Sequence, residues 1–260
     1  MNEFHKGLTY SSINLARSAV SSLGLKYEGI SLGSHPLVAR FMKGVYNLRP
    51  STAKYTDIWD TEQVLTYLKS MDEVSNLSLK LLSQKLAMLI ALTTACRVQT
   101  LHLLSVKDMK KNDNSWLLSL SSLQKHNRPG ANLKPIKLIA FPEDDKLCVV
   151  KTLEEYLQRT AELRQDETSL FISVRKPHKR VAKSSISRWI KELMAKAGID
   201  TVKYQAHSVR PASASKAKSR DAPIDLIMKT AGWTKESTFA RFYNKEIIGA
   251  QYSNIILHTI

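Results

Sequence analysis

The most informative stretch of this chain of 260 residues is His207-Ser208-Val209-Arg210, followed by Trp233 and Tyr243. On a helix, the i, i+3 spacing places the histidine and the arginine on one face. A histidine exchanges protons near neutral pH, whereas an arginine stays charged and offers phosphate oxygens a planar fork of donors. Tyr243 is a candidate nucleophile, and it needs a base and positive charge nearby because a free tyrosine has a pKa of about 10. These residue types together predict chemistry on a phosphodiester.

Two basic residues further upstream complete such a site. Arg97 ends the most apolar segment of the chain and supplies a second guanidinium for a phosphate. Lys125 lies in a stretch rich in turn residues, 124–130, from which it can reach and protonate a leaving oxygen. Trp233 contributes an indole N–H donor and a large packing surface. Each residue alone is more often a packing, capping or surface residue, so their joint order and spacing carry the prediction.

The charge balance indicates a polyanionic partner. The chain has 39 Lys and Arg residues against 23 Asp and Glu, a formal net charge of +16. Such an excess most often indicates nucleic acid, and the alternative is a basic protein with a solvated surface. The two cysteines, Cys96 and Cys148, have no paired spacing and no neighbouring His cluster. They argue against a disulfide framework and a zinc site, and they fit a reducing compartment.

No membrane segment is expected. The longest apolar stretch, 77–95, is interrupted by Lys80, Gln84 and Lys85 and therefore predicts a core helix. The N-terminus carries charged residues without an apolar run, so no signal peptide is expected either. The predicted location is nuclear, with cytoplasmic as the alternative.

The pattern along the chain predicts a mainly α-helical fold with a small antiparallel β-sheet, an α+β arrangement. Two short helices are expected within 9–48, followed by a linker over 49–57 that contains Pro50. The second domain, 58–260, is expected to hold β segments at 116–120 and 133–139. Its helices are predicted at 60–70, 78–95, 98–105, 147–163, 184–197, 207–219, 223–230, 236–243 and 246–257.

The order of these residues resembles that of the tyrosine recombinases, the phage-integrase superfamily. Three stretches carry the resemblance: 89–101 around Arg97, 207–215 around Arg210, and 231–245, which contains Tyr243. The resemblance covers about 58–257, and 1–48 is similar to part of the family's helical core-binding domain. The phrases at 10–19, 58–60 and 97–103 look most like DIRS-type retrotransposons, with Crypton transposons second.

The resemblance implies a role for each member of the set Arg97, Lys125, His207, Arg210, Trp233 and Tyr243. The tyrosine attacks a DNA phosphate and forms a 3′-phosphotyrosyl bond. The two arginines clamp the phosphate, the histidine and the tryptophan assist them, and the lysine protonates the 5′-hydroxyl leaving group. No metal or other cofactor is implied, because the covalent link conserves the energy of the broken bond for religation.

The chain departs from the family pattern at several positions. Thr100 stands where an acidic residue usually follows the first arginine, which affects the bracing of the site. Trp233 replaces the commoner histidine, and the interval to Tyr243 is one residue longer than usual. His126 and Arg128 are neighbours that compete with Lys125 for the role of general acid.

The resemblance also implies double-stranded DNA as the partner. Beyond the catalytic set, the residues predicted to bind DNA are Arg175, Lys176, Lys179, Arg180, Arg188, Lys216 and Lys218. The basic run 175–180 has a second interpretation as a nuclear localisation patch. The apolar segment 246–257 is predicted to be a helix that docks on a neighbouring protomer and forms a homodimer or homotetramer on DNA. The alternative is a helix folded on its own core.

The predicted function is therefore a site-specific DNA recombinase that integrates a mobile element. Two alternatives stay open. One is a domesticated or inactive DNA-binding module of the same fold, and the other is an enzyme like the type IB topoisomerases.

Overall fold

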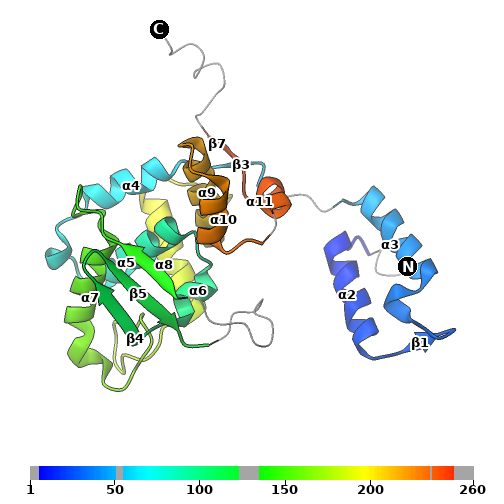
Figure 1. The fold of residues 1–260 in the computed structure, drawn as a ribbon, viewed down its shortest axis with the longest axis horizontal. Coiled ribbons are helices and arrows are strands. Elements are labelled where there is room, and N and C mark those ends of the chain that lie inside the picture. Colours follow the sequence, from blue (N-terminus) through cyan, green and yellow to red (C-terminus); the bar gives the residue numbers. More distant parts are fainter. Residues whose placement is uncertain (1–5, 51–54, 123–134, 235, 249–260) are drawn as a thin grey trace, which may run out of the picture. The chain divides into compact units, whose positions relative to one another are not determined.

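The structure is a computed structural model that describes residues 6–50, 55–122, 135–234 and 236–248. It divides the chain into two compact units, Met1–Lys54 and Tyr55–Ile260 (Figure 1). The boundary falls inside the linker predicted over 49–57, and the end of that stretch belongs to the second unit. The predicted class, mainly helical with a small antiparallel sheet, is confirmed.

The first unit is a pair of helices joined by a short hairpin. Its elements are α2 (Tyr10–Ser22), β1 (Lys26–Tyr27), β2 (Ile30–Ser31), η1 (Leu32–Ser34) and α3 (Pro36–Leu48). Thr9 caps α2, and Pro36 occupies the first turn of α3, a position that favours proline. Ile13, Met42 and Val45 form the buried cluster between the two helices.

The second unit is a helical domain built around α5. Its helices are α4 (Thr61–Ser70), α5 (Leu79–Thr94), α6 (Val98–Leu103), α7 (Val149–Arg164), α8 (Lys183–Lys196), α9 (Val209–Ser219), α10 (Ile224–Ala231) and α11 (Glu236–Phe242), with the 3-10 turns η2 (Val74–Asn76) and η3 (Ala206–Ser208). Every residue of α5 from 82 to 91 is buried, and α5 packs against α7, α8 and α9 (Figure 1). The core helix predicted over 78–95 is thus confirmed.

One face of this unit carries a three-stranded antiparallel sheet in the order β4-β5-β6. Its strands are β4 (Leu104–Asn112), β5 (Ser115–Leu120) and β6 (Ile136–Ile139). The β segments predicted at 116–120 and 133–139 correspond to β5 and β6, within the described residues. Strand β4 was not predicted, because its outer half is lysine-rich and exposed and so shows no apolar alternation.

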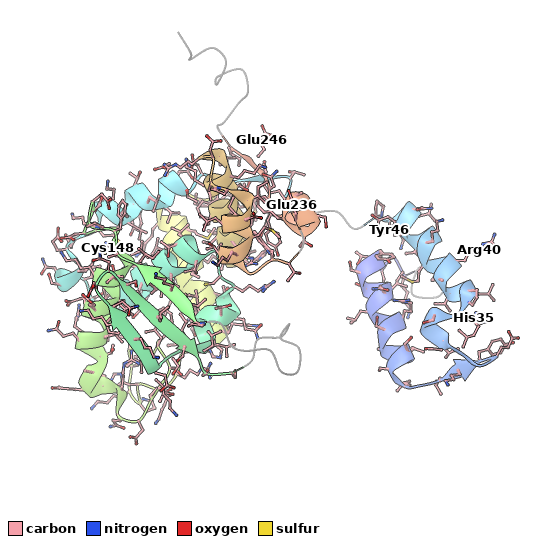
Figure 2. All side chains as sticks on the ribbon, viewed as in Figure 1. His35, Arg40, Tyr46, Cys148, Glu236 and Glu246 are labelled. Carbon is pink, nitrogen blue, oxygen red and sulfur yellow. The ribbon has the colours of Figure 1, made fainter. Side chains whose placement is uncertain are left out.

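A second, two-residue pairing joins distant parts of the chain. Strand β3 (Asp57–Ile58) pairs in parallel with β7 (Glu246–Ile247), and the Ile248 N–H donates to the Ile58 carbonyl at 2.8 Å. The helix predicted over 246–257 is therefore wrong at its first two residues, which form a strand, and 249–260 lies outside the described residues. Ile247 is buried against α9, and Glu246 is labelled beside this region in Figure 2.

Within the described residues, no helix has both the length and the hydrophobicity needed to cross a membrane.

Candidate active site

Arg210 is the centre of the site. It is the second residue of α9 and is only 5% exposed. Its Nη1 donates to the Ala95 carbonyl at 2.5 Å, and its Nη2 donates to the Ala231 carbonyl at 2.7 Å. These carbonyls lie at the C-terminal ends of α5 and α10, where the chain turns through the left-handed residues Ala95 (φ 46°) and Gly232 (φ 68°). Helix C-termini carry partial negative charge, so the two ends stabilise the buried guanidinium and fix its orientation.

Two aromatic rings cover this guanidinium. The Trp233 ring centroid lies 4.4 Å from Arg210 Cζ, and the Tyr243 centroid lies 5.4 Å from it. The two rings are 4.4 Å apart, which places the candidate nucleophile directly beside the arginine. Burial, together with the charge of Arg97, lowers the pKa of Arg210 to about 10, and Tyr243 opposes that shift. The guanidinium therefore stays charged at neutral pH.

Two donors at this point have no acceptor among the described residues. Arg210 Nε and Trp233 Nε1 are both buried, and neither donates a hydrogen bond there. Buried N–H groups are nearly always paired, and each unpaired one costs about 1–3 kcal/mol. Two adjacent donors, one of them on a cation, fit an anionic oxygen acceptor such as a phosphate.

Arg97 brings a second positive charge to the same place. It is the N-cap residue of α6, two residues after the left-handed Ala95 that ends α5, and it is half-buried. Its charge is the second-largest cause of the lowered pKa of Arg210, after burial. Like charges repel unless an anion lies between them, so the pair favours a shared anionic ligand. Thr100, which stands where the family usually has an acidic residue, lies one turn further along α6 and is buried.

His207 lies in η3, immediately before α9, and its ring is exposed. Its Nε2 and the Tyr55 hydroxyl are 3.1 Å apart, and the two rings stack with centroids 5.4 Å apart. The 3-10 turn therefore presents the imidazole just ahead of the helix that carries Arg210.

Tyr243 directly follows α11 and is partly buried. Its backbone N–H continues the helical pattern by donating to the Phe239 carbonyl at 2.9 Å. The turn that follows is held by Ser215 of α9, whose hydroxyl donates to the Tyr243 carbonyl at 2.8 Å and accepts from the Lys245 N–H at 2.9 Å. Ser215 therefore connects the nucleophile segment to the helix that carries Arg210.

The structure thus brings Arg97, Arg210, Trp233 and Tyr243 together, and it places His207 on the turn next to them. Lys125 lies outside the described residues, between β5 and β6. Tyr55 and Ser215 were not predicted as site residues from the sequence. Their roles depend on tertiary contacts, and no local pattern in the sequence signals them.

The residues predicted to bind DNA fall into two groups. Arg175, Lys176, Lys179 and Lys218 are exposed. The other three have partners within the protein: Arg180 donates to the His102 carbonyl, Arg188 pairs with Glu192 at 3.7 Å, and Lys216 pairs with Asp60 at 3.0 Å. Contacts with DNA stay a prediction for all seven residues. The charge of Lys216 is already paired with Asp60 within the protein.

Arg180 has a structural role at the base of the segment that contains Lys125. Its guanidinium donates to the His102 carbonyl at 2.6 Å and to the Ser121 hydroxyl at 3.4 Å. Burial, followed by the nearby charge of Arg180, lowers the pKa of His102. Arg180 therefore joins the end of α6 to the end of β5.

The described residues contain no cluster of three or more His, Cys, Asp or Glu side chains that could hold a metal ion. Burial raises the pKa of Cys96 to about 11, so this thiol next to Arg97 stays protonated at neutral pH.

The second unit has the catalytic fold of the tyrosine recombinases. The chain belongs to the phage integrase family, whose model matches residues 59–247.

Several solved structures share this fold. The chain is similar to XerA recombinase, with 19% identity and a TM-score of 0.55 over 97% of this chain and 83% of that one. It is also similar to the Tn1549 transposon integrase in complex with transposon right-end DNA, with 14% identity and a TM-score of 0.60 over 99% and 81% of the two chains. A lambda integrase dimer bound to a COC′ core site matches with 16% identity and a TM-score of 0.54 over 96% and 78%. No curated protein matches the chain significantly.

Proposed function

We propose that this protein is a site-specific recombinase that cuts and rejoins double-stranded DNA through a covalent bond to Tyr243. The observation that carries the proposal is the pair of buried, unpaired donors, Arg210 Nε and Trp233 Nε1, beside the Tyr243 ring. A DNA phosphate supplies the acceptor oxygens that both donors need. The same phosphate neutralises the two neighbouring guanidinium groups of Arg97 and Arg210.

The reaction is a transesterification. The Tyr243 oxygen attacks the phosphorus, the bond to the 5′ oxygen breaks, and a 3′-phosphotyrosyl link remains. The phenol proton passes to His207 or to water, and Lys125 donates a proton to the departing 5′ oxygen. The two arginines and Trp233 stabilise the negative charge that develops on the phosphate oxygens. Attack by a 5′-hydroxyl group reverses these steps and rejoins the strand.

The proposed role in the cell rests on the resemblance of the sequence to DIRS-type retrotransposons and Crypton transposons. We propose that the enzyme integrates a mobile element of the DIRS or Crypton type, acts in the nucleus, and assembles on DNA as a dimer or tetramer. The exposed residues Arg175, Lys176 and Lys179 support a DNA contact, because their charges lie on the surface. The Tn1549 transposon integrase, which has a similar fold, was captured with transposon end DNA, and this supports the mobile-element role.

The test is trapping of the covalent intermediate. Nicked duplexes made from the DNA on either side of the protein's own gene release a short strand after cleavage, so religation is blocked and the adduct accumulates. The proposal predicts a denaturant-resistant protein–DNA adduct with the wild type and none with Tyr243→Phe. Tyr46→Phe, a change of the same kind in the first unit, is the matched control and keeps the adduct. DNA binding without any wild-type adduct would instead favour an inactive DNA-binding module.

A further inference from the structure

Tyr55 holds the imidazole of His207. Tyr55 is only 7% exposed, its hydroxyl lies 3.1 Å from His207 Nε2, and the two rings stack at an interplanar angle of 29°. The backbone N–H of Gln205 donates to the same phenol oxygen at 3.2 Å. The phenol oxygen can accept from the Nε2–H of the neutral imidazole and equally from that of the imidazolium. Tyr55 therefore fits both protonation states of His207.

Asp57 and Trp59, which follow Tyr55, form hydrogen bonds with residues that precede and follow His207 in the sequence. The Asp57 carboxylate accepts from the Tyr204 hydroxyl at 2.7 Å and from Lys203 Nζ at 2.8 Å. The hydrogen bond from Lys203, followed by that from Tyr204, lowers the pKa of Asp57. Trp59 Nε1 donates to the buried Ser208 hydroxyl at 2.9 Å. These hydrogen bonds hold the segment that begins with Tyr55 against the turn that carries His207.

The same segment also contacts the strand that follows the candidate nucleophile. Ile58 of β3 pairs in parallel with Ile247 of β7, and Ile247 lies four residues after Tyr243 in the sequence. The segment 55–59 thus contacts both the histidine and the strand that follows the tyrosine.

We propose that Tyr55 is a positioning residue that fixes the ring orientation and the tautomer of His207 for the cleavage step. This inference rests on the proposed function. An exposed imidazole samples several rotamers, and a stacked ring with a hydrogen bond on one nitrogen removes that freedom before DNA binds. With the phenol oxygen as the acceptor for Nε2–H, the neutral ring carries its proton on Nε2, and Nδ1 is the nitrogen that accepts the Tyr243 proton.

The experiment uses the full chain with Tyr55→Phe, which keeps the stacked ring and removes the hydroxyl. Tyr156→Phe is the matched control, because the Tyr156 phenol is also buried and also accepts a backbone N–H, from Ile172 at 3.1 Å, in the core. The ring ¹⁵N signals of His207, assigned by their loss in His207→Ala, report the tautomer. The rate of adduct formation on the nicked duplex reports positioning, and DNA affinity is measured in parallel.

Tyr55→Phe is expected to move the His207 ring ¹⁵N signals towards those of a free imidazole and to slow adduct formation about tenfold or more. DNA affinity stays unchanged, Tyr156→Phe behaves like the wild type, and Tyr55→Phe has no further effect in the His207→Ala background. Unchanged His207 signals, an unchanged adduct rate, or an equal loss of rate in the His207→Ala background overturns the inference. If the wild type forms no adduct, the proposed function fails, and the ¹⁵N signals alone then decide whether Tyr55 sets the tautomer.

Discussion

Replacing Ser215 with alanine tests how the nucleophile is held. Ser215 is 3% exposed, and its hydroxyl makes two hydrogen bonds to the backbone around Tyr243, at 2.8 and 2.9 Å. Each such bond contributes about 1 kcal/mol, so their loss weakens the observed position of the turn by about 2 kcal/mol. If cleavage requires that position, Ser215→Ala slows adduct formation by up to ~30-fold. The assay is the single-turnover rate of adduct formation on a nicked duplex at saturating protein.

Two variants control this experiment. Ser213→Ala removes a hydroxyl from the same helix, but that hydroxyl donates to the Leu92 carbonyl of α5 at 2.5 Å and not to the nucleophile turn. Ser215→Thr keeps a hydroxyl at position 215. A loss of rate is expected only for Ser215→Ala. Equal rates for Ser215→Ala and wild type, or an equal loss for Ser213→Ala, would refute it.

Three further predictions concern buried groups. Arg210→Lys is expected to lower the adduct rate by about 10²-fold or more, because one ammonium cannot bond both helix-end carbonyls and also present a planar fork to the phosphate; single-turnover kinetics measure this. Trp233→Phe keeps a ring over Arg210 and removes the unpaired indole N–H, so we expect a loss of about tenfold in rate with little change in the urea midpoint. Lys85 is fully buried with its Nζ on the Leu68 carbonyl, and burial lowers its pKa below 10.5. The unfolded chain therefore binds the Lys85 proton more tightly, and the stability of the wild type relative to Lys85→Met rises as the pH approaches 10.5, which urea unfolding at pH 7 and pH 9.5 measures.

Helices could be predicted where the residues that indicate them lie close together in the sequence. The apolar run of α5 and its Ser78 cap lie within one short stretch of sequence, and the structure has the helix where that stretch predicts it. The strand at 246–247 was not predictable in the same way. Ile247 begins an apolar segment that fits a helical pattern equally well, and only pairing with Asp57–Ile58, far away in the chain, makes residues 246–247 a strand.

The site shows the same division between local and non-local information. The residue types of Arg97, Arg210, Trp233 and Tyr243 indicated the chemistry from the sequence, and the structure brings them together. What the sequence could not show is how they are held: two helix ends bind Arg210, and a serine on α9 holds the turn after the tyrosine. Those contacts join backbone atoms from distant elements, so they leave no periodicity or motif. For the same reason the internal ion pair of Lys216 was not foreseen.

Tyr243 is the residue that we expect to form the covalent bond to DNA. Proteolysis of the trapped adduct, followed by mass spectrometry, identifies the residue that carries the nucleotide. The account predicts that the nucleotide is attached to the tyrosine of the peptide around 243 through a 3′-phosphate. Attachment to any other residue, or an adduct that persists in Tyr243→Phe, would contradict it.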